Sequence, residues 1–241
     1  MLGSTSGIGR AVALCLAEAG VDVVIHGRSE SKGREVAALA ASRNVRTHLV
    51  MADLADRSAS DRLLDEAWSV WGGLDAWLHV AGADVLTGPG RRSTFEEKLD
   101  ALLAVDVVST IRLAREVGRR MKARGGGSIV TMGWDQAETG MEGDSGELFA
   151  ATKAAIMGFT KSLAVSLAPA VRVNAIAPGW IKTSWGDHAP REWVERVMRE
   201  TPLGRWGTVE DVAQVARFLV SPAASFMTGQ VIRVNGGAVR L

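Results

Sequence analysis

Short apolar segments rich in β-branched residues alternate along the chain with longer segments of helical periodicity. The segment 21–26, Val-Asp-Val-Val-Ile-His, is typical of a buried strand. By the same criteria, strands are expected at 46–51, 74–80, 128–132, 171–176 and 230–234, and helices at 8–19, 30–42, 59–71, 94–124 and 149–167. Gly20 stands where the first helix should end. The alternation predicts an α/β fold, a doubly wound parallel sheet with helices on both faces.

Composition narrows the classes of partner. Lys and Arg number 28 against 27 Asp and Glu, so no basic excess indicates nucleic acid or an anionic membrane. No apolar run reaches the roughly 20 residues that span a bilayer, and the first residues lack the regions of a signal peptide. Cys15 is the single cysteine and no two histidines have ligand spacing, so we expect no metal. We expect a cytoplasmic protein without nucleic-acid or membrane partners.

A glycine-rich segment opens the chain. Residues 3–9, Gly-Ser-Thr-Ser-Gly-Ile-Gly, lead directly into the first predicted helix. Glycines permit a tight turn and let the backbone approach a pyrophosphate, whose charge then lies at the helix N-terminus. The next strand ends about 20 residues later, where the adenosine ribose of a dinucleotide is expected. The segment therefore predicts a dinucleotide-binding turn.

Further motifs follow in a fixed order, and with them the chain resembles the short-chain dehydrogenase/reductase family over nearly its whole length. The motifs are Ala52-Asp53-Leu54, Val80-Ala81-Gly82, residues 172–179 ending in Pro178-Gly179, and Thr228-Gly229-Gln230 with Asn235-Gly236-Gly237. The resemblance implies one Rossmann-type domain over residues 1–241, with the substrate pocket and a lid at about 183–206 built in. It also implies a homodimer or homotetramer.

The resemblance carries a set of cofactor-binding residues onto this chain. These are Gly3, Ser6, Gly7, Ile8, Gly9, Asp53, Leu54, Ala81, Gly82, Lys153, Pro178, Gly179, Ile181 and Thr183. One departure concerns the first strand, which in the family precedes the glycine turn. Only Met1 and Leu2 stand before Gly3, so the first strand is truncated here. We expect a longer natural N-terminus that supplies it; the alternative is a truncated fold.

The residues after the strand expected at 21–26 affect the choice of dinucleotide. Relatives that prefer NAD usually have an acidic residue where this chain has Gly27, and Arg28 follows. A guanidinium can pair with the 2′-phosphate of NADP, and His26 is a second candidate for that role. The sequence therefore favours NADP, with NAD as the alternative.

The catalytic positions depart from the family pattern of Asn, Ser, Tyr and Lys. Lys153 is kept, but Phe149 stands at the tyrosine position, and the chain contains no tyrosine. Trp134 stands at the serine position and Asp106 at the asparagine position. We expect Asp106 to pair with Lys153 and keep it charged, which suits holding the nicotinamide ribose.

The segment between Trp134 and Phe149 is about two residues longer than expected and is acidic. Asp135 is a candidate substitute acid, although an acidic solvated loop is the alternative. With Trp134 and Phe149, the tryptophans at 180, 185, 193 and 206 predict a pocket with aromatic walls for a small apolar or aromatic substrate.

Three functions remain open from the sequence. The first is an NADP-dependent oxidoreductase with an altered proton relay, acting on a bond such as activated C=C or C=N that needs little help from tyrosine. The second is a non-catalytic NADP-binding protein. The third is a lyase or isomerase that uses Asp135 or Glu138 as a base.

Overall fold

A parallel sheet forms the centre of the protein in the computed structural model, which describes residues 1–85, 89–183, 186 and 189–240. One ladder pairs β1 (Val23–Gly27) with β2 (Thr47–Met51). The other has the order β3 (Ala76–His79), β4 (Gly127–Met132), β5 (Val171–Pro178) and β8 (Val231–Val234). All of these pairings are parallel. The predicted strands are therefore confirmed, with ends that shift by a few residues.

Residues 1–4 lie between the two ladders. Leu2 forms a single parallel bridge with His79, and its N–H donates to the Leu78 carbonyl at 2.9 Å. On the other side the Met1 amino group donates to the Val24 carbonyl at 2.7 Å. These few bonds connect β1 and β3 where a full strand would otherwise pair with both.

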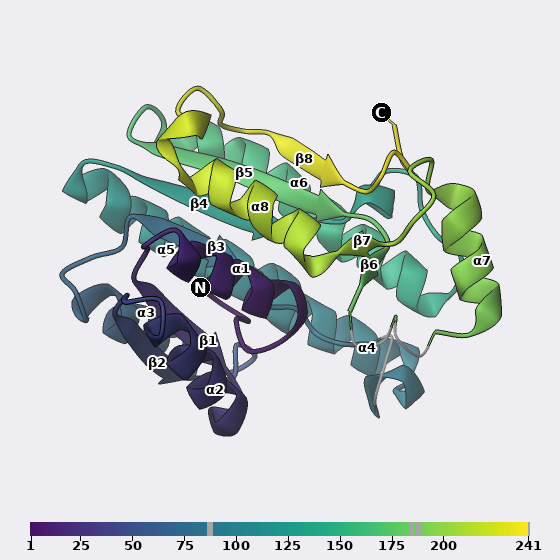
Figure 1. Ribbon diagram of the computed structural model, residues 1–241, viewed down its shortest axis with the longest axis horizontal. Helices are drawn as coiled ribbons and strands as arrows, with labels where there is room; N and C mark the ends of the chain where they lie inside the picture. The colour runs from purple at the N-terminus through teal and green to yellow at the C-terminus, as the bar shows by residue number, and fades with distance from the viewer. Residues whose placement is uncertain (86–88, 184–185, 187–188, 241) are drawn as a thin grey trace.

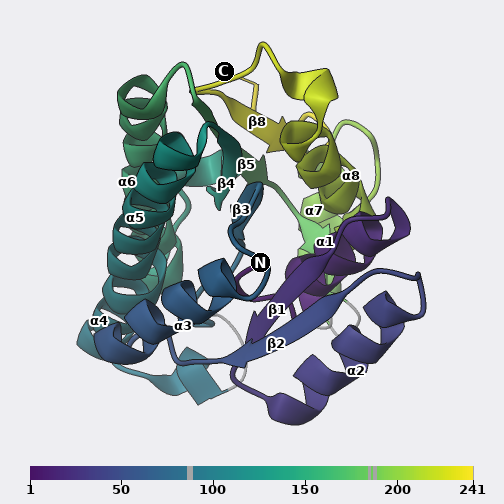
Figure 2. The ribbon, with the colours of Figure 1, turned by 90° about the vertical axis from the view of Figure 1, so that its left-hand side faces the viewer.

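Helices cover both faces of the sheet, as the alternating pattern predicts (Figures 1 and 2). One apolar core packs the sheet against α3 (Arg57–Ser69), α5 (Ser109–Arg124) and α6 (Asp144–Leu167). A second packs the other face against α1 (Gly7–Glu18), α2 (Glu30–Ala41) and α8 (Val209–Val220). Gly20, with φ of 79°, follows the end of α1 as expected. The α/β class with a doubly wound parallel sheet is therefore confirmed.

The segment 94–124, expected to form one continuous helix, has three parts. It comprises α4 (Phe95–Leu102), a π-helical turn at Leu103–Val108, and α5. The turn contains Asp106, which is 1% exposed and contacts Lys153 inside the protein. Local widening of a helix commonly accompanies a functional side chain turned inward.

The helix α7 (Arg191–Glu200) lies in the lid region predicted at about 183–206. The short strands β6 (Ile181–Lys182) and β7 (Gly207–Thr208) pair in parallel on either side of it. Trp185, predicted as part of the aromatic wall, lies outside the described residues.

The helix α6 is long and apolar enough, by length and composition alone, to cross a membrane. Its buried residues Leu163, Ala164 and Leu167 pack in the core with α5 and the sheet. A core helix of a globular domain meets the same criterion, so its composition follows from this packing.

Candidate active site

The glycine-rich turn has the shape that its sequence predicts. Gly3 and Gly7 have φ of 71° and 49°, where side chains are disfavoured. A Cβ at Gly9 would lie 1.9 Å from the Gly3 carbonyl oxygen, so only glycine fits there. The Ser6 side chain caps no amide of α1, which leaves first-turn N–H groups for an anion. The turn therefore fits the pyrophosphate of a dinucleotide.

The predicted cofactor segments gather around this turn at the carboxyl ends of the strands. A Cβ on Gly3 would lie 2.6 Å from the Ala81 backbone, and one on Gly7 would lie 3.7 Å from the Thr183 side chain. Ile181 lies in β6 and is half-buried, two residues after Gly179 in the turn that follows β5. Ligands of open α/β sheets bind at this edge. The structure thus brings together residues that are far apart in the sequence.

His26 has a different role from the one considered at the sequence level. Its Nδ1 accepts a hydrogen bond from the Gly3 N–H, and its Nε2–H donates to the Ala52 carbonyl, both at 3.1 Å. Burial lowers the pKa of His26 to about 4, so the ring is neutral at physiological pH. With both nitrogens engaged, His26 is not a phosphate ligand; it fastens the glycine turn to the Ala52–Leu54 segment.

The end of β1 presents one cation and excludes a side chain. Arg28 is exposed and, within the described part of the chain, forms no ion pair. A Cβ on Gly27 would lie 2.4 Å from the Thr5 side chain, so a carboxylate there would clash. Asp53 is exposed and caps the Ala55 N–H, while Leu54 is buried. The adenosine end of the site therefore has a free guanidinium and no acid at position 27.

A buried ion pair joins two of the residues that the sequence places at the family's catalytic positions. The Lys153 Nζ lies 2.5 Å from Asp106 Oδ1, and the two side chains are 9% and 0% exposed. The other oxygen of Asp106 accepts a hydrogen bond from the Ala83 N–H at 2.8 Å. A Cβ on Gly82 would lie 3.0 Å from Asp106 Oδ1. Asp106 thereby fixes both Lys153 and the turn after β3.

Two aromatic rings stand beside this pair. Phe149 precedes Lys153 by one turn of α6, and its ring centroid lies 6.1 Å from that of Trp134 in an edge-to-face arrangement. Neither ring carries a hydroxyl, so neither can exchange a proton with a substrate oxygen. The arrangement is chemically suited to orienting an apolar or aromatic group and to excluding water.

Asp135 lies in the interior rather than on a solvated loop. It is 0% exposed, and its Oδ2 accepts a hydrogen bond from the Asn235 side chain at 3.1 Å. Its Oδ1 is buried without a hydrogen-bond partner in the described structure, and burial raises the pKa to about 6. Asn235 was recognised only as part of a C-terminal motif; its contact with Asp135, 100 residues away, has no local signal in the sequence.

The acidic residues around Asp135 are engaged elsewhere. Glu138 forms an ion pair with Arg233 of β8, which lowers its availability as a base. Glu142 pairs with Arg196 of α7. Of the five acidic residues in this segment, Asp135 is therefore enclosed and Glu138 and Glu142 are ion-paired, whereas Asp144 and Glu147 are exposed.

His79, at the end of β3, is also enclosed. Its Nε2 lies 3.3 Å from the Ser109 hydroxyl, and burial lowers its pKa to about 3. It is a neutral residue between the sheet and α5.

A glycine turn at the carboxyl edge of a parallel sheet, with a lysine beside it, defines a dinucleotide-dependent oxidoreductase of the Rossmann type. Comparison with known proteins agrees. The family model described as enoyl-(acyl carrier protein) reductase matches residues 3–239. The chain belongs to the short-chain dehydrogenase/reductase family, whose members are NAD(P)-dependent oxidoreductases.

Individual relatives cover the whole chain. It is 37% identical to the 3-oxoacyl-(acyl-carrier-protein) reductase FabG of Aquifex aeolicus, over 98% of this chain and 94% of that one. A gluconate 5-dehydrogenase from Burkholderia cenocepacia, solved with NADP and tartrate, has a TM-score of 0.87 at 30% identity, covering 98% and 93%. A 7α-hydroxysteroid dehydrogenase, solved with NADH and a bile-acid ligand, has a TM-score of 0.90 at 28% identity, covering 100% and 93%.

Proposed function

We propose that this protein is an NADP-dependent oxidoreductase whose site lacks the usual tyrosine and serine and acts on a small apolar or aromatic substrate. The observation that carries the proposal is the contact of Trp134 with Phe149 next to the buried Lys153–Asp106 pair. The lysine that holds the nicotinamide ribose is retained, while the groups that protonate a carbonyl oxygen are replaced by rings.

In the proposed reaction, different residues of the chain bind the cofactor and orient the substrate. Bound NADPH would supply hydride from its nicotinamide ring. Gly3, Gly7 and Gly9 would hold the pyrophosphate, and Lys153, held in place by its ion pair with Asp106, would donate hydrogen bonds to ribose hydroxyls. Trp134 and Phe149 orient the substrate and keep water out. A polarised C=C or C=N bond fits this site better than a ketone, because it needs less proton assistance.

The preference for NADP over NAD is part of the proposal. Arg28 is exposed and able to meet a 2′-phosphate, and the contact of Gly27 with Thr5 excludes the acid that usually binds the ribose of NAD. Both dinucleotides occur among the solved relatives, since one of these structures holds NADP and another NADH.

A rebuilt site tests the missing proton donor. The double variant Phe149→Tyr with Trp134→Ser is assayed with NADPH against a panel of small ketones, beside Phe159→Tyr, which places a tyrosine on the outer face of the same helix. We expect activity only in the double variant, because a positioned acid contributes about 10² to 10⁴ in rate. Robust ketone reduction by the unmodified protein would overturn the assignment.

A non-catalytic NADP-binding protein is the second candidate. It is favoured by the same pair of rings, which occupy the position where a carbonyl would lie, and by the enclosure of Asp135. NADPH binding without activity on any polarised C=C, C=N or ketone substrate, in both the unmodified protein and the double variant, would favour it. The lyase or isomerase is disfavoured, because Asp135 is enclosed and Glu138 is ion-paired.

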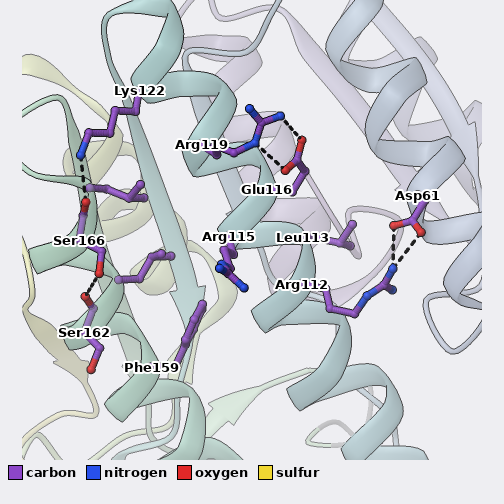
Figure 3. A pocket seen from close by; sticks show the side chains of 12 residues that line it. Asp61, Arg112, Leu113, Arg115, Glu116, Arg119, Lys122, Phe159, Ser162 and Ser166 are labelled. Atoms are coloured by element: carbon purple, nitrogen blue, oxygen red, sulfur yellow. Dashed lines mark hydrogen bonds and ion pairs between the residues drawn. The ribbon is translucent and has the colours of Figure 1, made fainter.

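We also propose that two copies associate through α5 and α6. A groove of about 730 Å³ runs between these helices (Figure 3), and Phe159, Leu163 and Leu167 are among the residues that line it. Arg115 points into it and forms no ion pair with the described residues. On the adjoining face of α6, Val165 is 81% exposed, and a Cβ on Gly158 would meet nothing within 4 Å. An exposed valine beside open space at a glycine suits close approach of a second helix pair.

A further inference from the structure

The helix α7 is held to the rest of the protein by few buried contacts. Among its ten residues, Val197 is the one that is buried. Val194 and Met198 are 37% and 48% exposed. A helix with so little buried apolar surface has low local stability, so its position depends on the contacts of its other side chains.

Arg196 makes several of those contacts. Its guanidinium lies 5.8 Å from the Trp180 ring and 5.2 Å from the Trp193 ring. Its Nε donates to Glu200 at 2.8 Å, and its Nη1 donates to Glu142 at 2.6 Å. We call Glu142, Trp180, Trp193, Arg196 and Glu200 the Arg196 cluster.

The cluster is closed by a further hydrogen bond and continued by a further ring. The indole N–H of Trp180 donates to the second oxygen of Glu200 at 3.1 Å. Trp180 also packs against Trp193 and Trp206, at ring-centroid distances of 5.4 and 6.3 Å. Arg196 is thus stacked on aromatic faces and ion-paired at the same time, which fixes its planar group in one orientation.

The two ends of the cluster belong to different parts of the candidate site. Trp180 directly follows Gly179, at the turn expected beside the nicotinamide. Glu142 lies between Trp134 and Phe149, on the segment that is longer than the family spacing. Arg196 therefore connects α7 to both segments that border the substrate side of the site.

The connection to Glu142 is the weaker of the two. The Glu142 side chain is 76% exposed, whereas that of Arg196 is 23% exposed. Solvent and salt screen an exposed ion pair, while the stacked rings are shielded from them. The contact between α7 and the 138–143 segment is therefore one that can open and close without loss of the fold.

We propose that Arg196 is a positioning residue that holds α7 against the 138–143 segment and so sets the size of the space offered to the substrate. Its consequence for substrate choice rests on the proposed oxidoreductase function. The contact itself is a property of the protein alone, so it is measured without cofactor or turnover.

Amide hydrogen exchange of the full chain tests the contact. We compare the unmodified protein with Glu142→Gln, Arg196→Lys and Arg191→Ala. The last is the matched control, since Arg191 forms an ion pair with Glu195 within α7 alone. Loss of an exposed ion pair corresponds to roughly a 2- to 5-fold rise in opening. We expect such a rise over residues 193–200 in Glu142→Gln and Arg196→Lys, unchanged exchange in β4, and a smaller effect in the control.

Salt gives a second, independent measurement. Raising NaCl from 0.05 to 1 M should increase exchange of α7 in the unmodified protein towards that of Glu142→Gln. It should increase exchange less in Glu142→Gln itself, because that variant lacks the Arg196–Glu142 pair and keeps only the pairs within α7. Equal exchange of α7 in Glu142→Gln and in the unmodified protein at both salt concentrations would overturn the proposal. With an accepted substrate, Glu142→Gln should raise kcat/KM for bulky members of a series relative to small ones. A uniform change across the series would contradict the role in substrate choice and leave the proposed function untouched.

Discussion

The buried Asp135 carboxyl lowers the stability of the folded protein by an amount that depends on pH. Burial raises its pKa to about 6, so in the folded protein it loses its proton at a higher pH than in the unfolded chain. Between the two pKa values the folded state binds more protons, and stability therefore falls as pH rises through this window. Above pH 6 the folded protein contains an ionised carboxylate with one oxygen that has no hydrogen-bond partner among the described residues.

Replacing this group should stabilise the protein, most strongly at neutral and alkaline pH. In Asp135→Asn the side-chain oxygen can still accept from Asn235, but no charge is buried. We expect a higher Tm than in the unmodified protein, with a gain in unfolding free energy about 1 kcal/mol larger at pH 8 than at pH 5. Thermal unfolding at the two pH values measures this. A gain that is equal at both would mean that Asp135 is not the titrating group.

Arg28 is the residue on which cofactor choice should depend. We expect Arg28→Ala to weaken binding of NADPH by about 1 to 3 kcal/mol, the range for one charge-assisted contact, and to leave NADH nearly unchanged. Titration of the two reduced cofactors by fluorescence measures both affinities. Arg34→Ala is the control, because that residue pairs with Glu30 on the outer face of α2. Equal affinities for NADPH and NADH in the unmodified protein would contradict the assignment.

At the level of elements, the sequence predicted those whose apolar periodicity is uninterrupted. The strands and α1, α2 and α3 fall in this group. The π-helical turn was not predicted, because its cause is Asp106, whose partners Lys153 and Ala83 lie elsewhere in the sequence. Periodicity reports a helix but not a change of helical pitch within it.

Two helices near the C-terminus were missed for different reasons. The start of α8 carries a capping box, in which Thr208 and Asp211 satisfy each other's backbone N–H groups, and this signal is legible in the sequence. The helix α7 offers less, since most of its residues are charged and its place is determined by Arg196 and the tryptophans around it. The features of the candidate site also differ in how far the sequence predicted them. The glycine turn was predictable from local pattern, whereas the neutral His26 and the enclosed Asp135 depend on contacts across the fold.

For the whole molecule, the order of the strands fixes which helices face outward together. Since β3, β4 and β5 are neighbours, the helices that connect them, α5 and α6, lie side by side on one face (Figure 2). Their outer surfaces form one continuous face with the groove between them. The proposed pairing of two copies therefore follows from topology as much as from side chains.

A charge on this face should separate the copies. We expect Val165→Glu to raise the dissociation constant of the dimer at least about tenfold, because it buries an unpaired carboxylate in the interface. Sedimentation over a range of concentrations measures the constant. Val21→Glu, on the turn between α1 and β1, is the control, and Val21 is likewise exposed, at 40%. A monomer at all concentrations in the unmodified protein would show that the face is not an interface between copies.

The close approach of Gly27 to Thr5 restricts the order in which the cofactor preference can change. A carboxylate at position 27 collides with the Thr5 side chain as long as that side chain is present. Removing the Thr5 side chain first, as in Thr5→Gly, opens the space, and only then does an acid at position 27 become acceptable. The two substitutions are therefore strongly non-additive, and one order of acquiring them passes through a defective intermediate. A lineage of such proteins would change from one dinucleotide to the other by losing the Thr5 side chain first and gaining the acid at position 27 afterwards. A library randomised at position 27 alone would return glycine.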